Sequence, residues 1–326
     1  MTAELRLRRA GAQLLHRPRR ATPTQLVQDL LAVQAQDLRS AKLALRARTE
    51  ALAAADVDRA LSRDRSLVAA WLCRGTLHLV SADDYPWVLS LTAPSRMANS
   101  RRRLAQEGVS PDDAERAMDV IGRALADEGP LIRSQLAERL EAEGIRTQGQ
   151  ATAHLAMLSA LRGISVLGPL TENGQAFVLT RDWLGEQPSP PDRDTALKEL
   201  ARRYLAAHAP ATDADLAAWS GLPLRDARAG LSAVSHVEPD PPERIEPCLL
   251  PAFDPYLLGW RDRSFAVPAK HARRVHPGGG ILRATAIDET GLVVGTWTNP
   301  RDPQIEPFGR LPEGLAADAR EVASFF

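Results

Sequence analysis

The chain has 326 residues, of which 44% are hydrophobic and 25% are charged; this is typical of a soluble globular protein and indicates two or three domains. The 41 basic residues balance 41 acidic ones, so no overall positive charge attracts nucleic acid. Cys73 and Cys248 are the only cysteines, which argues against a disulfide framework and a four-cysteine zinc site. We find neither a signal-peptide pattern nor a run of 18 apolar residues, and we expect a cytoplasmic protein that does not contact a membrane.

The first part of the chain, residues 1–110, predicts helices followed by a strand. A helix start signal, Thr22-Pro23-Thr24, precedes the amphipathic run TPTQLVQDLLAVQ. We predict another helix from Asp56 to Gly75, over DVDRALSRDRSLVAAWLCRG, and a strand in the alternating segment TLHLV. This order is compatible with a winged-helix unit over residues 1–110.

Residues 111–190 show the winged-helix pattern most clearly. Three helices are predicted from PDDAERAMDVIGRALADEG, LIRSQLAERLEAEG and QATAHLAMLSALRG. A hairpin follows in ISVLGPLTENGQAFVLT, where Asn173-Gly174 lies between alternating hydrophobic residues. We therefore predict a second winged-helix unit here.

The remainder of the chain predicts two further parts. Residues 191–242 contain DLAAWSGLPLRDARAGL, two helices joined by a glycine-containing turn as in a helix-turn-helix, and we predict a third winged-helix unit. Residues 243–326 hold short apolar runs, including a hairpin through Glu289-Thr290-Gly291, and end in a helix. The expected fold class is mainly α with small β elements (α+β): three tandem winged-helix units and a C-terminal β element.

Enzyme signatures with a specific spacing are absent from the sequence. It contains no phosphate-binding loop, no dinucleotide-binding glycine motif and no G-x-S-x-G elbow. The histidines are scattered, so we expect neither a metal site nor a cofactor. Winged helices place one helix in a DNA groove and the hairpin on the backbone, and three in tandem suggest a clamp around duplex DNA.

Several segments in this order resemble one protein family. VQAQDLRSAKLALRAR, WLCRGTLHLVSADDYPWVLSLTAP, LLPAFDPYLLGWRDRS and LVVGTWT are similar to winged-helix DNA glycosylases of the AlkZ/YcaQ type. The resemblance implies tandem winged helices in a C-shaped arrangement, a monomer, and excision of bulky N7-alkylguanine adducts, including some interstrand crosslinks, from double-stranded DNA. It implies that Gln34 and Gln36 are catalytic, as the Gln-x-Gln motif of the AlkZ branch.

Neutral amides suit this chemistry because an N7-alkylguanine is already cationic and leaves without protonation. The enzyme must stabilise a developing positive charge on the sugar and place a water molecule, and an amide can accept and donate hydrogen bonds for both tasks. On a regular helix, residues two apart point about 200° away from each other. Both amides therefore reach one site only if the helix ends or distorts near Ala35; otherwise Gln34 and Gln36 merely cap a helix.

Supporting roles are expected for a few other residues. Asp37 either holds Gln36 or a water molecule, or caps the next helix, which we favour. Lys42 is expected at the protein surface and not as a Schiff-base nucleophile, which makes the glycosylase monofunctional. His78 either contacts the DNA backbone or is a buried, satisfied histidine. DNA contacts are expected from six arginines: Arg96, Arg101, Arg102, Arg103, Arg273 and Arg274. Of these, Arg273 and Arg274 either form a hairpin that enters the minor groove or lie in a surface loop.

Two other functions remain open from the sequence. The chain is alternatively a non-catalytic winged-helix DNA-binding protein, such as a transcriptional regulator or a lesion sensor. A third alternative is a resistance protein that sequesters an alkylating compound.

Overall fold

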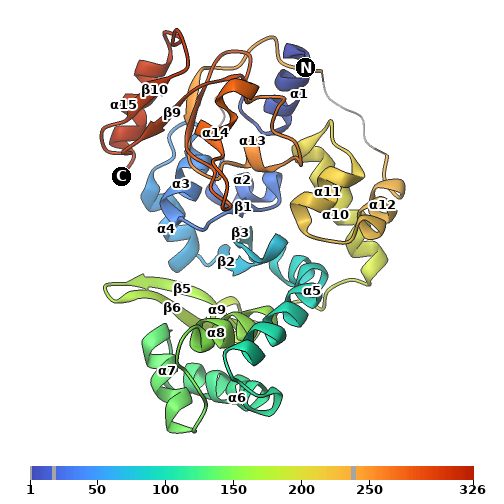
Figure 1. Ribbon diagram of the computed structural model, residues 1–326, viewed down its shortest axis with the longest axis vertical. Coiled ribbons are helices and arrows are strands. Elements are labelled where there is room, and N and C mark those ends of the chain that lie inside the picture. The colour runs from blue at the N-terminus through green and yellow to red at the C-terminus, as the bar shows by residue number, and fades with distance from the viewer. Residues whose placement is uncertain (1, 17–19, 236–239) are drawn as a thin grey trace. The chain divides into compact units, whose positions relative to one another are not determined.

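The computed structural model describes residues 2–16, 20–235 and 240–326, and these form two compact units (Figure 1). The first unit combines Met1–Asp58 with Leu197–Phe326, and the second is Arg59–Ala196. Helices predominate, and the strands form small antiparallel sheets, which confirms the predicted α+β class. The number of winged-helix units and the four predicted domain boundaries stay predictions.

In the first unit, helices from the start of the chain pack with the C-terminal β element. Its strands pair antiparallel in the order β10-β9-β8-β7, and the predicted hairpin through Glu289-Thr290-Gly291 joins β8 to β9. One core contains Tyr256, Trp260 and Phe265, and a second joins α3 and α15 to this sheet. The elements are α1 (Ala3–Ala12), α2 (Pro23–Leu30), β1 (Val33–Gln34), α3 (Leu38–Arg46), α11 (Asp213–Ser220), α12 (Leu224–Ser232), β7 (Cys248–Leu250), α13 (Pro255–Leu258), η2 (Ala269–His271), α14 (Ala272–Val275), β8 (Thr285–Ile287), β9 (Val293–Thr298), β10 (Gln304–Pro307) and α15 (Leu315–Ser324).

The two helices and the turn predicted in DLAAWSGLPLRDARAGL, residues 215–231, are present as α11 and α12. Thr212 caps α11 with a capping box, in which its side chain accepts from the Asp215 backbone N–H and the Asp215 carboxylate accepts from the Thr212 backbone N–H. Gly221 ends α11 in the left-handed conformation, with φ of 77°. The two boundaries between the units fall within the helices α4 (Ala54–Ser62) and α10 (Arg193–His208).

The second unit is built on five strands in the order β3-β2-β5-β6-β4, with helices packed around them. The three helices and hairpin predicted for residues 111–184 are present, and Glu172-Asn173 forms the tip of the hairpin. Leucines and alanines of α6, α7 and α8 form its core. The elements are β2 (Leu67–Trp71), η1 (Cys73–Gly75), β3 (Leu77–Ser81), α5 (Tyr85–Gln106), α6 (Pro111–Glu128), β4 (Leu131–Ile132), α7 (Arg133–Ala142), α8 (Ala151–Leu161), β5 (Ser165–Thr171), β6 (Gly174–Leu179) and α9 (Thr180–Leu184).

One predicted element is wrong. The helix expected from Asp56 to Gly75 ends at Ser62 in the structure, and Leu67–Trp71 forms β2, paired antiparallel with β3. Arg65, with φ of 52°, breaks the helical backbone before the strand. The apolar run SLVAAWL has no alternation to distinguish a buried strand from a buried helix, and its pairing with Leu77–Ser81 decides the outcome.

Candidate active site

Gln34 and Gln36 lie in a short extended segment between two well-capped helices. Thr22 caps the start of α2, and Leu31, with φ of 68°, ends it. The chain then forms the two-residue strand β1, and α3 begins at Leu38. The helix thus ends at Leu30, before Gln34, so the condition set from the sequence is met and the two amides do not lie on a regular helix.

The burial of this segment alternates from residue to residue. Val33 and Ala35 are buried, whereas Gln34 is half-buried and Gln36 is exposed. In an extended chain, alternate side chains lie on the same side of the backbone. The strand ends at Gln34 and a bend follows at Gln36, so Gln34 and Gln36 are the more exposed side chains of a segment that is not helical.

Asp37 caps α3, as favoured from the sequence. Its carboxylate accepts hydrogen bonds from the backbone N–H groups of Arg39 (3.1 Å) and Ser40 (3.2 Å). The Ser40 hydroxyl also donates to it, at 2.8 Å. These three bonds hold the carboxylate and fix the direction in which the backbone leaves Gln36.

Buried ion pairs anchor the remainder of α3 and the residues that follow it. The Lys42 ammonium lies 2.5 Å from the Asp58 carboxylate, with only 11% of the lysine side chain exposed, so the predicted surface position of Lys42 is wrong. Arg46 pairs with Asp318 at 2.8 Å, and the fully buried Arg48 pairs with Asp254 at 2.7 Å. The segment that carries the two amides is thus attached to a rigid helix.

His78 is a buried histidine of β3, in the second unit. Its Nδ1–H donates to the Thr76 carbonyl at 2.9 Å, and the side chain is almost completely inaccessible to solvent. Burial, assisted by the positive charge of Arg74, lowers the pKa of His78 from 6.5 to about 3. His78 is therefore neutral at physiological pH, as expected for the structural alternative.

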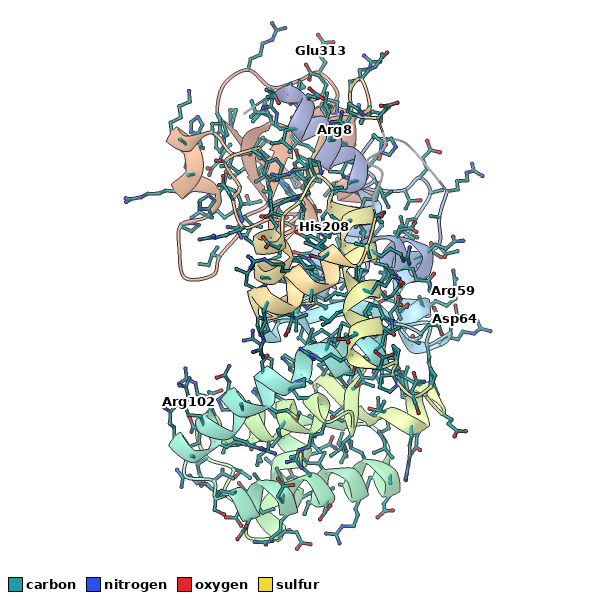
Figure 2. The ribbon with its side chains drawn as sticks, turned by 90° about the vertical axis from the view of Figure 1, so that its right-hand side faces the viewer. Arg8, Arg59, Asp64, Arg102, His208 and Glu313 are labelled. Carbon is teal, nitrogen blue, oxygen red and sulfur yellow. The ribbon has the colours of Figure 1, made fainter. Side chains whose placement is uncertain are left out.

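Four of the predicted DNA-binding arginines lie on α5 of the second unit. Arg101, Arg102 and Arg103 are exposed, and Arg96 is half-buried. Figure 2 labels Arg102, whose side chain extends from α5 toward solvent. The helix therefore presents consecutive guanidinium groups that can contact phosphates.

The other two predicted arginines lie in the first unit, in the short helix α14. Arg273 is exposed, whereas Arg274 lies 4.6 Å from the centre of the Phe308 ring and pairs with Glu306 at 3.3 Å. The hairpin that we considered for these residues does not include them; a tight turn follows at Gly278–Ile281. Arg273 is thus the more accessible of the two.

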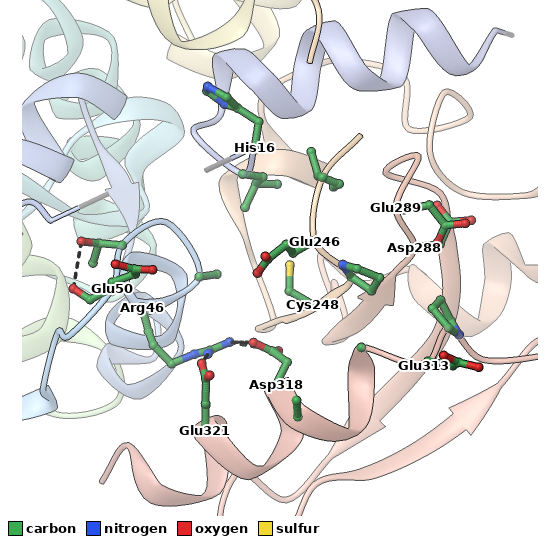
Figure 3. A pocket seen from close by; sticks show the side chains of 18 of the residues that line it. His16, Arg46, Glu50, Glu246, Cys248, Asp288, Glu289, Glu313, Asp318 and Glu321 are labelled. Carbon is green, nitrogen blue, oxygen red and sulfur yellow. Dashed lines mark hydrogen bonds and ion pairs between the residues drawn. The ribbon is translucent and has the colours of Figure 1, made fainter. Parts of the chain in front are cut away.

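A cavity of the first unit is a separate feature, which the sequence did not predict. It has a volume of about 1400 Å³ and lies between Leu15 and His16, the segment after α3, and α15 (Figure 3). Its lining contains three arginines and seven carboxylates: Glu50, Glu246, Asp288, Glu289, Glu313, Asp318 and Glu321. This excess of negative charge disfavours DNA phosphates, and neither Gln34 nor Gln36 lines the cavity.

Groups of metal ligands and membrane-spanning helices are both absent from the described residues. Cys73 and Cys248 are both buried and free, and no three His, Cys, Asp or Glu side chains cluster as metal ligands within residues 2–16, 20–235 and 240–326. In the same part of the chain, every helix is too short or too polar to cross a lipid bilayer.

Comparison with known proteins identifies the class to which this fold and site belong. The model of the AlkZ-like DNA glycosylase family matches residues 27–324, so the chain belongs to this family and is a DNA glycosylase. This confirms the resemblance seen in the sequence, and it identifies DNA as the partner.

Two similar proteins come from Streptomyces sahachiroi. An interstrand DNA cross-link repair glycosylase is 27% identical over 325 residues, which cover 89% of this chain and 85% of the relative. The solved structure of the DNA glycosylase AlkZ superposes with a TM-score of 0.80 at 25% identity, covering 98% of this chain and 95% of the other.

Proposed function

We propose that the chain hydrolyses the N-glycosidic bond of N7-alkylguanine nucleotides in duplex DNA, including those in interstrand crosslinks. The observation that carries the proposal is the non-helical Gln34-Ala35-Gln36 segment between capped helices, in which both amides are more exposed than Val33 and Ala35. The name of the S. sahachiroi relative, an interstrand cross-link repair glycosylase, supports crosslinks as substrates.

The two amides act on the sugar in this proposal. As the bond between C1′ and N9 breaks, its electron pair moves to the base and neutralises the charge of the N7-alkylguanine. The amide oxygens face the positive charge that develops on the sugar, and an amide orients the water whose oxygen attacks C1′. The water then loses a proton to solvent. No general acid is needed, which agrees with the neutral state of His78.

DNA binding is proposed for the exposed arginines of the two units. Arg101, Arg102 and Arg103 on α5, and Arg273 on α14, contact backbone phosphates, while the partly engaged Arg274 contributes less. We expect the protein to act as a monomer, without a metal or cofactor, and its three winged-helix units to surround the duplex.

Release of free base tests the proposal. The protein is incubated with a duplex that carries a single N7-methylguanine, and with a duplex that carries a defined N7-linked crosslink; released bases are quantified by mass spectrometry. Enzyme-dependent release of N7-methylguanine and unhooking of the crosslink are expected. Tight binding of either duplex without release would instead favour a lesion sensor, and binding of the free alkylating compound would favour sequestration.

A further inference from the structure

A tight turn between β2 and β3 holds Arg74 in an unusual conformation. Arg74 has φ of 56° and ψ of 2°, a left-handed region that residues with a Cβ rarely adopt. The Gly75 N–H donates to the Leu72 carbonyl at 2.8 Å, and the Thr76 N–H and hydroxyl donate to the Cys73 carbonyl at 3.2 and 3.1 Å. The surrounding bonds thus impose the strain on Arg74, and strain of this kind concentrates at functional sites.

A second arginine lies against the same turn. A Cβ atom on Gly75 would come within 3.1 Å of Cδ of Arg96, so the absence of a side chain at Gly75 makes room for the Arg96 stem. Arg96 is half-buried and forms no hydrogen bond or ion pair with any residue that the structure describes. A partly desolvated guanidinium without an anion is unfavourable, and an incoming anion would relieve this cost.

The positive charges of Arg74 and Arg96 both act on the Cys73 thiol. Burial raises the pKa of the Cys73 thiol to about 11, and the nearby charges of Arg74 and Arg96 oppose this rise. The same charge of Arg74 adds to the effect of burial on His78. Two guanidinium groups therefore flank one short turn of the second unit.

We propose that Arg74 and Arg96, brought together at the β2–β3 turn, bind one backbone phosphodiester of the DNA substrate. Arginine suits this ligand because its planar fork donates several hydrogen bonds to phosphate oxygens. The turn fixes the position of Arg74 through its backbone and that of Arg96 through packing against Gly75. The phosphate is therefore held at a defined position on the protein. The inference rests on DNA as the substrate and does not depend on which base is excised.

The first test measures how the affinity for an undamaged duplex depends on salt. Each lost phosphate contact should reduce the slope of log K against log salt concentration by about 1. We expect this reduction in Arg96→Gln and in Arg74→Gly, with affinity about three- to tenfold weaker near physiological salt. Unchanged slopes in both variants would overturn the proposal.

Matched controls separate this site from a general loss of charge. Arg65 also has positive φ, at 52°, but its guanidinium lies 4.1 Å from the Trp183 ring centre, so Arg65→Gly makes the same backbone and charge change elsewhere in the unit. Arg139 already pairs with Glu128 at 2.8 Å, so Arg139→Gln is the control for Arg96→Gln. Equal effects of the controls on the slope would contradict a site at the turn.

Thermal unfolding distinguishes binding from a structural role of Arg74. Glycine adopts positive φ without a steric penalty, so Arg74→Gly should unfold at the same temperature or a higher one while it binds DNA more weakly. A lowered unfolding temperature, with loss of binding only in proportion to it, would show that Arg74 is structural and would overturn its role in the site.

A second measurement identifies the source of the phosphate. Neutral methylphosphonates are placed one at a time along the duplex backbone, and one position should weaken binding to the wild type clearly more than binding to Arg96→Gln, which retains only Arg74 at that phosphate. If Arg96→Gln instead abolishes saturable binding of inorganic phosphate and leaves duplex affinity unchanged, the site binds free phosphate and the proposal fails. Because undamaged DNA is used, these results are independent of base release.

Discussion

Lys42 shows at the residue scale what a sequence pattern does and does not determine. Its position in an amphipathic helix argued against a nucleophile, which stays a prediction, and the same pattern placed the side chain at the surface. In the structure Lys42 is buried and ion-paired with Asp58, sixteen positions further along the chain, and no local pattern indicates such a partner. Asp37 was predictable because a helix cap depends only on residues within one turn.

Borohydride trapping tests the monofunctional assignment. The Lys42 side chain is buried and paired with Asp58, so we expect it not to attack a sugar and expect no covalent enzyme–DNA product when borohydride is added during turnover. A trapped product that disappears in Lys42→Ala would show that the enzyme also acts through a Schiff base.

The lowered pKa of His78 predicts how stability depends on pH. The folded protein holds His78 neutral down to about pH 3, whereas the unfolded chain binds the proton below about 6.5. The free energy of unfolding should therefore fall as the pH drops from 6.5 toward 3, by at most about 1.4 kcal/mol per pH unit for this residue.

The variant His78→Asn isolates this contribution, because asparagine can donate to the Thr76 carbonyl but does not titrate. Denaturant unfolding at pH 7 and pH 5 should show a smaller loss for the variant than for the wild type. Equal losses would mean that His78 titrates normally in the folded protein.

At the scale of elements, locally encoded features were predictable and long-range pairings were not. The hairpin of β5 and β6 and the helices α11 and α12 follow from turn residues and caps within a few positions. The anchoring of α3 depends on Arg48 and Asp254, which are 206 positions apart, and only the fold brings them together. An interruption of the helix near Ala35 could be considered from the sequence, but the short strand at Val33–Gln34 could not.

Removal of the α3 cap tests whether Asp37 positions the segment that carries the amides. Asp37→Ala leaves the Arg39 and Ser40 N–H groups without their acceptor and should cost about 1 kcal/mol, or about 2–4 °C in Tm. We expect excision to slow as well, because Gln36 is adjacent. Asp37→Ser, which retains a capping oxygen, should restore both; excision that stays fast in Asp37→Ala would show that the cap does not position Gln36.

At the scale of the whole molecule, the distribution of charged residues matters more for DNA binding than the net charge, which is zero. The cavity near α15 in the first unit is acidic, whereas α5 of the second unit presents consecutive arginines. The helix α8, which a winged helix would place in the groove, has most of its side chains buried and can read few base edges. Recognition should therefore depend mainly on the DNA backbone.

Duplex binding should accordingly show a steep salt dependence and little sequence preference. Phosphate contacts do not distinguish sequences, so unrelated undamaged duplexes should give similar affinities and similar salt slopes in anisotropy titrations. A preference of several orders of magnitude for one palindromic sequence would contradict this and would indicate a regulator.

Single-turnover excision by alanine variants tests whether Gln34 and Gln36 stabilise the transition state. The charge on the sugar develops only as the bond breaks, so each substitution should slow release of N7-methylguanine by about 10²–10³. Duplex affinity should change less than about tenfold, and the unfolding temperature should be unchanged. Excision at the wild-type rate by both variants, with folding and binding intact, would contradict the account.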